Sequence, residues 1–216
     1  MHSAIAKQAA SSVQYQRFQQ TVSAEVLLAA QNGDQAAFSV LYQTYSRAVH
    51  TLAFGICGNR HCAEDILHNT YIKLVDKLPS FEGRAPLGMW IRKIAVNESL
   101  MYLRKNKKHK AVVSSDEFNF FDDYTNAGAG SDGAGEFPSC ESNFTDTIDN
   151  CSDINGLLLK LPEESRQVLW LKEVEGYTHN EIAGMLNKTP SYSKSIVARA
   201  LQFLRARINP EKEHAC

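Results

Sequence analysis

Polar and cationic side chains gather at the start of one helical segment near the end of this 216-residue chain. They follow Pro190 and comprise Ser191, Tyr192, Lys194, Ser195 and Arg199. Hydroxyl groups can bond to base edges in a DNA groove, while lysine and arginine side chains pair with phosphates. This set therefore predicts contacts with double-stranded DNA.

Two helix-start signals would position these side chains. Thr178 and Glu181 stand in capping-box spacing, in which the hydroxyl and the carboxylate each satisfy a free backbone amide. Thr189 is a second N-cap candidate, and Pro190 suits a first helical position because that residue needs no amide donor. Together they predict a helix-turn-helix, whose second helix enters the major groove. An ordinary helical hairpin with a solvated polar face is the alternative.

Composition narrows the class of protein. The chain is 44% hydrophobic, yet no stretch approaches the ~20 apolar residues of a membrane span. The first residues lack a secretory apolar core, so a cytoplasmic protein is expected. The five cysteines form no Cys-x-x-Cys pair, which favours free thiols in a reducing compartment. We expect no cofactor and no metal; a metal site built from Cys57, His61 and Cys62 is the alternative.

The net charge of −1 conceals a strong segregation of charge along the chain. Residues 84–110 carry eight basic side chains and a single acidic one, Glu98. Residues 111–156 carry ten acidic side chains and no lysine or arginine. A basic helix end favours phosphate contacts, whereas the acidic stretch favours solvation or a basic partner.

Apolar residues at helical spacing predict four helices in the first half of the chain. Ser23 is expected to cap Ala24–Gln31, and Asp34 a long helix that ends at Gly58. A third helix is expected from about His61 to Leu78. Its inward residues would be Ala63, Ile66, Leu67, Thr70, Tyr71, Leu74, Val75 and Leu78. A fourth follows the loop Phe81–Pro86 and ends in the basic run.

The expected fold is all-α, with two small helical domains joined by a long flexible acidic linker. Residues 1–22 are interpreted as a mobile arm, 23–110 as the first domain, 111–154 as the linker, 155–209 as the helix-turn-helix domain and 210–216 as a tail. The linker is rich in Gly, Ser, Asp and Asn, so it cannot bury enough apolar surface to offset its ordering entropy. In the second domain, one helix is expected from Pro162 to about Val174.

Motifs in both expected domains resemble those of bacterial sigma factors. Ala63–Tyr71, Trp90–Asn97 and Tyr102–Arg104 resemble the first conserved domain, while Leu161–Arg166 and several motifs within Glu175–Ala200 resemble the second. Their order is similar to that of the extracytoplasmic-function (ECF) group, which keeps only these two domains. The resemblance implies a non-enzymatic protein that binds the β and β′ subunits of core RNA polymerase, directs it to promoters and helps to open promoter DNA. An anti-sigma protein is a further expected partner.

The resemblance also implies three binding surfaces. Core polymerase would contact Glu64, Asp65, His68, Asn69 and Lys73 on the third helix. The −10 element would contact Phe81, Arg84, Arg92, Lys93, Asn97, Arg104 and Lys105, with Trp90 favoured as a packing residue. The −35 element would contact Ser191, Tyr192, Lys194, Ser195 and Arg199.

Other interpretations remain open from the sequence. A dimeric regulator that binds an operator would also use a helix-turn-helix, and an adaptor that binds only proteins would also carry segregated charge. The family usually has acidic residues where this chain has Cys62 and Asn69, which suggests phosphorylation of Thr70 as a way to restore negative charge. The acidic linker is expected to enter the basic RNA path of the polymerase; a simple tether is the alternative.

Overall fold

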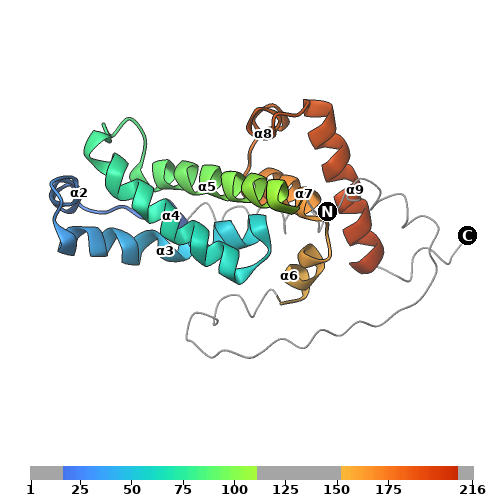
Figure 1. The fold of residues 1–216 in the computed structure, drawn as a ribbon, viewed down its shortest axis with the longest axis horizontal. Coiled ribbons are helices and arrows are strands. Elements are labelled where there is room, and N and C mark those ends of the chain that lie inside the picture. The colour runs from blue at the N-terminus through green and yellow to red at the C-terminus, as the bar shows by residue number, and fades with distance from the viewer. Residues whose placement is uncertain (1–16, 111–151, 209–216) are drawn as a thin grey trace, which may run out of the picture.

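The computed structural model describes residues 17–110 and 152–208, and these form an all-α structure without a β-strand (Figure 1). The expected all-α class is therefore confirmed for the described residues. Residues 1–16, 111–151 and 209–216 lie outside them. Most of the expected linker and tail, and the greater part of the expected arm, fall in those stretches.

Four helices and one short 3-10 turn build the first domain. Helices α2 (Ala24–Gln31), α3 (Gln35–Cys57), α4 (Arg60–Lys77) and α5 (Leu87–Lys110) occur in chain order. The turn η1 (Leu78–Ser80) follows α4. Helices α3, α4 and α5 pack on one another, and α2 packs on α3. The four helices expected from the sequence are thus confirmed.

Side-chain caps fix where these helices begin. The Asp34 carboxylate accepts from the Ala37 amide at 2.8 Å, and the Asn59 side chain accepts from the Cys62 amide at 3.1 Å. The Ser23 hydroxyl accepts the Val26 amide at 3.3 Å. Helix α3 ends at Gly58, whose φ of 68° lies in the left-handed region that glycine adopts without steric cost.

The core of this domain corrects two expectations. Phe18 is fully buried and the Tyr45 hydroxyl donates to the Gln20 carbonyl at 2.5 Å, so the end of the expected mobile arm is anchored to this domain at these two residues. Val75 is 52% exposed, so its expected inward position on α4 is wrong. The largest fully buried side chains of these helices are Leu41, Tyr45, Leu52, Ile56, Ile66, Leu74, Ile91 and Leu100.

The second domain contains α6 (Ser152–Leu159), α7 (Glu163–Leu169), α8 (His179–Leu186) and α9 (Pro190–Ile208). Helices α6, α7 and α8 all pack on α9. Helix α6 starts three residues before the expected domain boundary at residue 155. The short turn between α8 and α9 confirms the helix-turn-helix.

The single helix expected from Pro162 to Val174 is interrupted. After α7 the chain forms a π-helical turn, η5 (Trp170–Val174), in which the Glu175 amide donates to the Trp170 carbonyl at 3.0 Å. A π-turn widens the helix by one residue and shifts the direction of the side chains that follow. The periodicity of the sequence gives no sign of such a turn.

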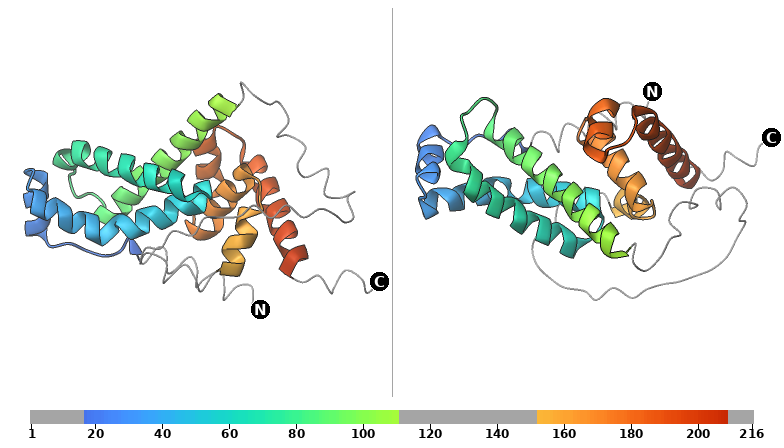
Figure 2. Two further views of the ribbon diagram at one scale, coloured as in Figure 1. Left: turned by 60° about the horizontal axis from the view of Figure 1, so that its bottom comes forward. Right: turned by 45° about the horizontal axis from the view of Figure 1, so that its top comes forward.

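The two domains touch, and α7 and η5 lie against α3 (Figure 2). Close approach depends on two glycines of the first domain. A Cβ atom at Gly55 would overlap the Trp170 ring, and one at Gly58 would overlap the Arg166 guanidinium. The absence of side chains at these two positions therefore makes room for the second domain.

Candidate nucleic-acid and protein interfaces

The first turns of α9 present the expected DNA-reading side chains. Ser191, Lys194, Ser195 and Arg199 are all exposed. The opposite side of α9 is buried through Ser193, Ile196, Val197 and Ala200. The helix is therefore held by its apolar side and leaves its polar side free for a groove.

The backbone at both helix starts is well capped. Glu181 accepts from the Thr178 amide at 2.7 Å while the Thr178 hydroxyl accepts from the Glu181 amide at 3.2 Å, which confirms the capping box. The hydrogen bonds hold the pKa of Glu181 below its usual value. At α9 the Thr189 hydroxyl accepts from the Tyr192 amide at 3.2 Å. Between the helices Asn187 takes a left-handed conformation with φ of 55°.

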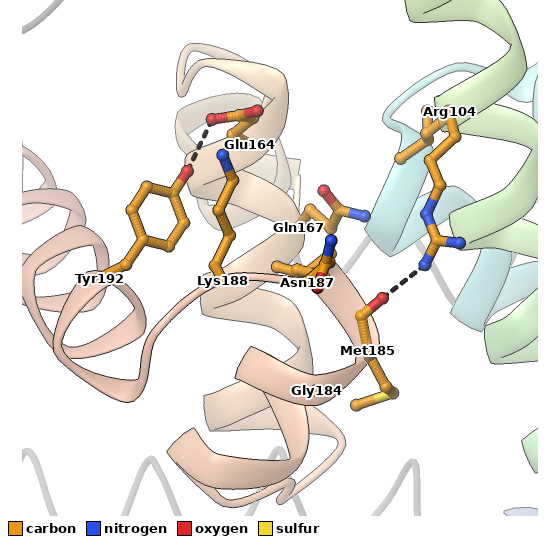
Figure 3. A pocket seen from close by; sticks show the side chains of 10 residues that line it. Arg104, Glu164, Gln167, Gly184, Met185, Asn187, Lys188 and Tyr192 are labelled. Carbon is orange, nitrogen blue, oxygen red and sulfur yellow. Dashed lines mark hydrogen bonds between the residues drawn. The ribbon is translucent and has the colours of Figure 1, made fainter.

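Tyr192 differs from its neighbours on α9 because its hydroxyl already has a partner. That hydroxyl donates to a Glu164 carboxylate oxygen at 2.6 Å, and burial together with Glu164 raises the pKa of the phenol (Figure 3). The Lys188 ammonium lies 5.5 Å from the centre of the Tyr192 ring. Lys188 was missed by sequence reasoning; it is an exposed cation in the turn that precedes the reading helix.

A hollow of about 470 Å³ separates this turn from the end of α5 (Figure 3). Leu103 and Arg104 line it from the first domain, and Gln167, Met185 and Tyr192 are among the residues that line it from the second. The Arg104 guanidinium donates to the Met185 carbonyl at the rim. One expected DNA-binding cation is thus engaged with the second domain.

The loop before α5 holds an aromatic pair at the surface. The Phe81 and Trp90 ring centres lie 4.9 Å apart, and both side chains are half-buried. The Gln31 side-chain amide donates to the Phe81 carbonyl at 2.9 Å, which anchors the loop to α2. Arg84 is 86% exposed and forms a salt bridge with Glu82 at 2.5 Å. Trp90 therefore packs on Phe81 and remains partly accessible.

The expected DNA-binding residues of α5 lie in two environments, the solvent-exposed surface and the buried contact between the domains. Lys93, Asn97 and Lys105 are exposed. Arg92 is buried between the domains and donates through Nε to a Glu175 carboxylate oxygen at 2.6 Å. A phosphate contact from Arg92 would thus require Glu175 to move away first.

Glu175 is the centre of this buried network. Arg92 also donates to the Glu175 carbonyl, and its guanidinium carbon lies 4.7 Å from the centre of the Tyr177 ring. The Trp170 indole donates to the other Glu175 carboxylate oxygen at 3.2 Å. Burial raises the pKa of Glu175, while the Arg92 charge and the hydrogen bonds from Arg92 and Trp170 oppose that rise. The network joins α5 to the segment between η5 and α8.

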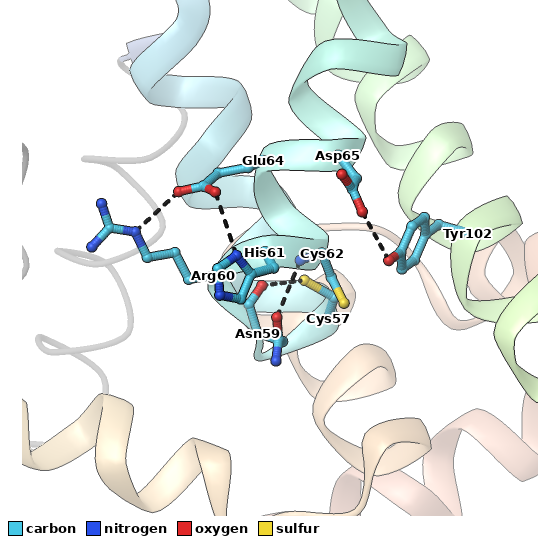
Figure 4. A network of polar contacts seen from close by, with 8 residues as sticks. All are labelled: Cys57, Asn59, Arg60, His61, Cys62, Glu64, Asp65 and Tyr102. Carbon is cyan, nitrogen blue, oxygen red and sulfur yellow. Dashed lines mark hydrogen bonds and ion pairs between the residues drawn. The ribbon is translucent and has the colours of Figure 1, made fainter. Parts of the chain in front are cut away.

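The exposed side of α4 carries the expected polymerase-binding residues. Glu64, Asp65, His68 and Asn69 are exposed. Glu64 pairs with Arg60 at 3.0 Å and with His61 at 3.8 Å (Figure 4). Asp65 accepts a hydrogen bond from the Tyr102 hydroxyl at 3.2 Å. A hydrogen bond to Cys62 and burial raise the pKa of Tyr102 to about 12, so this hydroxyl remains a donor at neutral pH.

Lys73 lies at the edge of this face and pairs with Glu98 of α5, whose side chain is buried. Two apolar residues nearby were missed as site candidates. Ile72 is 48% exposed and Val75 is 52% exposed; Ile72 follows Asn69 by three residues, and Val75 follows Ile72 by three. Contiguous exposed apolar area, which single scattered residues do not form, is typical of interaction surfaces. The seven-residue steps from Asp65 to Ile72 and from His68 to Val75 were the signal available in the sequence.

Two alternatives from the sequence find no support. Thr70 is fully buried and its hydroxyl donates to the Ile66 carbonyl at 2.7 Å, so a kinase cannot reach it in this structure. Within residues 17–110 and 152–208, no three His, Cys, Asp or Glu side chains cluster in a way that could hold a metal ion. Cys57, His61 and Cys62 accordingly form no metal site.

Comparison with known families decides the identity of this fold. The family model "Sigma-70 region 2" matches residues 41–109, and "Sigma-70, region 4" matches residues 152–204. Together the two matches cover more than half of the chain. The chain belongs to the sigma-70 family of RNA polymerase sigma factors. This sigma factor therefore has no enzymatic role: it binds RNA polymerase and directs promoter-specific initiation of transcription.

Relatives of this sigma factor come from distant bacteria. ECF RNA polymerase sigma factor SigW of Bacillus subtilis is 25% identical over 180 residues, which cover 82% of this chain and 91% of SigW. The ECF RNA polymerase sigma-E factor of Haemophilus influenzae is 26% identical over 185 residues, covering 83% of this chain and 92% of the relative. Both matches span the two domains.

One solved structure similar to this sigma factor is that of RpoE in complex with the anti-sigma factor NepR from Bartonella quintana. The two chains are 19% identical, the match covers 81% of this chain and 98% of the other, and the TM-score is 0.47. A separate property of the described helices is their hydropathy: none of them is both long enough and apolar enough to cross a membrane.

Proposed function

We propose that the sigma factor divides promoter recognition among three surfaces. The exposed face of α4 binds core polymerase, the loop Phe81–Pro86 with α5 binds the −10 element, and the start of α9 binds the −35 element. The observation that carries this proposal is the polar side of α9, with Ser191, Lys194, Ser195 and Arg199 exposed on a capped helix-turn-helix. The two domains that carry these surfaces would be residues 23–110 and 155–209. Helix α6 begins three residues earlier than the second of these ranges.

Upstream recognition combines phosphate and base contacts. Lys194 and Arg199 are exposed cations that can pair with phosphates, and Ser191 and Ser195 can reach base edges. Tyr192 contributes its ring face and backbone, because Glu164 holds its hydroxyl. Lys188 adds a cation beside the same groove.

Downstream opening uses the Phe81 and Trp90 pair. A base that leaves the stack is stabilised by stacking on an aromatic ring, worth about 1–3 kcal/mol per base. Phe81 is partly exposed at the loop, with Arg84 beside it and Lys93 and Asn97 exposed on α5. These side chains offer a ring for the base and charge for its phosphates.

Polymerase docking uses both polar and apolar contacts of α4. Glu64, Asp65, His68 and Asn69 supply polar groups, while Ile72 and Val75 supply apolar area. The β and β′ subunits are the proposed partners. An interface with an apolar centre and a polar rim is the usual arrangement in protein complexes.

Run-off transcription with purified core polymerase tests this function directly. Initiation at defined promoters only when the sigma factor is added supports it, and a lack of initiation with intact protein contradicts it. The same assay separates a sigma factor from an operator-binding dimer or an adaptor. A cytoplasmic location, an anti-sigma partner and entry of the acidic linker, residues 111–154, into the RNA path remain proposals; pull-down from cell extract and abortive-product assays test the latter two.

A further inference from the structure

The two domains meet where the second domain covers bare backbone of the first. At Gly55 in α3, the three nearest atoms to a Cβ would all belong to the Trp170 indole of η5. One turn later, at Gly58, they would all belong to the Arg166 guanidinium of α7. Trp170 and Arg166 both belong to the second domain. The absence of side chains at Gly55 and Gly58 therefore allows the two domains to pack closely.

Arg166 also completes the end of α3. Its guanidinium donates to the Cys57 carbonyl at 2.6 Å, at the C-terminus of that helix. The last carbonyls of a helix lack intrahelical donors and carry partial negative charge, so a cation there is favourable. A residue of the second domain thus caps a helix of the first.

The Arg92–Glu175 pair adds a charged contact beside these glycines. The Glu175 carboxylate accepts from Arg92 through one oxygen and from Trp170 through the other. Trp170 therefore belongs to both contacts: its ring covers Gly55 and its indole nitrogen bonds Glu175. The apolar and charged parts form one continuous interface.

This interface engages side chains that the proposed function assigns to promoter DNA. Arg92 is bound to Glu175, and Arg104 is bound to the Met185 carbonyl at the end of α8. While these bonds persist, Arg92 is buried away from phosphates, and one guanidinium nitrogen of the exposed Arg104 is already engaged. The second domain thus covers part of the DNA-binding side of α5.

Promoter geometry requires the domains to separate. The positions for which the −35 and −10 elements are named differ by about 25 base pairs, or about 85 Å along the duplex at 3.4 Å per base pair. The longest helices of this chain, α3 and α5, are each about 35 Å long at 1.5 Å per residue. Two domains in contact are therefore too close to span both elements. Residues 111–151 are long enough to bridge them, since an extended chain covers about 3.3 Å per residue.

We propose that the free sigma factor is held in a closed state by the Trp170–Gly55 contact and the Arg92–Glu175 pair, and that this state withholds Arg92 and Arg104 from −10 DNA. The DNA part of this proposal rests on the proposed function, whereas the closed state itself does not. The interface can open because it is not perfectly satisfied. Among the described residues, Glu163 Oε1 and Arg166 Nε are buried without a hydrogen-bond partner, and such atoms make a contact less costly to break.

Gly55→Ala in the full-length chain is the sharpest test. Alanine favours a helix more than glycine does, so the substitution supports α3 while its methyl group displaces Trp170. Trp170→Ala attacks the same contact from the other domain and leaves α3 unchanged. Gly156→Ala is the matched control, because glycine 156 lies in α6 with open space around its Cβ position.

Two measurements read the result. Small-angle X-ray scattering of the free protein should show a larger radius of gyration for Gly55→Ala and Trp170→Ala than for wild type and Gly156→Ala. Binding to a single-stranded −10 oligonucleotide should strengthen about tenfold in the same two variants if the open state is about a tenth of the wild-type population.

The two readouts separate the two parts of the proposal. Equal radii of gyration in all four proteins would overturn the closed state, whatever the DNA affinity. A larger radius with unchanged DNA affinity would overturn the withholding of Arg92 and Arg104, and would place the fault in the assignment of the −10 surface. A larger radius with stronger binding supports both parts.

Discussion

The Arg92 guanidinium and the Glu175 carboxylate form a buried salt bridge of 2.6 Å across 83 residues of sequence, with side-chain exposures of 9% and 1%. Each of the two residues comes from a different domain. Buried ion pairs lose much of their attraction to desolvation, and they contribute most visibly when one partner is removed. The stability of the structure should therefore depend strongly on keeping both partners of the pair.

Neutralising one partner of this pair should lower the free energy of unfolding. Glu175→Gln leaves the Arg92 charge buried without its counter-ion, which typically destabilises a protein by about 3–5 kcal/mol. Urea unfolding followed by tryptophan fluorescence should show an earlier transition. The double substitution Arg92→Met with Glu175→Leu removes both charges and should recover most of the loss. A double variant as unstable as Glu175→Gln would show that the ion pair is not the cause.

Reversing one charge on α4 should weaken binding to core polymerase. Asp65→Arg replaces an exposed carboxylate of the proposed polymerase-binding face by a cation and should raise the dissociation constant tenfold or more, equivalent to about 1.4 kcal/mol. Glu25→Arg makes the same charge change at an exposed site on α2 and serves as the control. Fluorescence anisotropy with core polymerase measures both. Equal affinities for the two variants would argue against the α4 face.

Phosphate and base contacts on α9 should respond differently to substitution. Lys194→Ala should weaken binding to every −35 sequence alike and reduce the salt dependence by about one ion. Ser195→Ala should instead relax the preference at one position of the element. Arg205→Ala, an exposed cation in the last turn of α9, is the control for charge alone. A promoter library scored at several salt concentrations distinguishes these effects, and a uniform loss for Ser195→Ala would refute its base contact.

Phe81 of the loop before α5, which packs on Trp90 of α5, should be needed for DNA opening. Phe81→Ala with Arg84→Ala removes the proposed stacking ring and a neighbouring cation, and should lower the reactivity of −10 thymines to permanganate. Lys77→Ala, an exposed cation at the end of α4, is the control. Normal opening by the double variant would show that the loop has no part in it.

Acidification should destabilise the first domain through His50. Burial lowers the pKa of His50 below 6.5, with Glu64 opposing and Arg60 reinforcing the shift. The folded state therefore disfavours the protonated ring, so this contribution to stability is intact above pH 6.5 and is lost as the pH falls through the window below it. His50→Gln should make the melting temperature less dependent on pH between 7.5 and 5.5.

Local signals in the sequence predicted the helices because they act over three or four residues. Asp34 and Thr178 cap the helices expected of them, and each uses only its own side chain and nearby amides. The exposed residues of α9 were predictable for the same reason: the buried stripe of that helix leaves only one side free.

Contacts between domains were not predictable in this way. Helical periodicity shows that a side chain is apolar or cationic, but it cannot show which distant segment covers it. Arg92 was expected at a phosphate because it lies in a basic stretch, yet Glu175 neutralises it from the other domain. Trp170 lies in the segment expected as one helix from Pro162 to Val174, and no local pattern there indicates that its ring covers Gly55 of the other domain.

The rate at which the Cys57 thiol is alkylated should depend on whether the two domains are in contact. Its thiol is buried at the end of α3, and burial is the main cause that raises its pKa to about 11. Arg166 of the second domain bonds the carbonyl of the same residue. Because alkylating reagents attack the thiolate, Cys57 should react slowly until Arg166 withdraws and water reaches the sulfur. Peptide mapping after timed iodoacetamide treatment would then record opening of the molecule without any added label, with the partly exposed Cys62 as an internal reference.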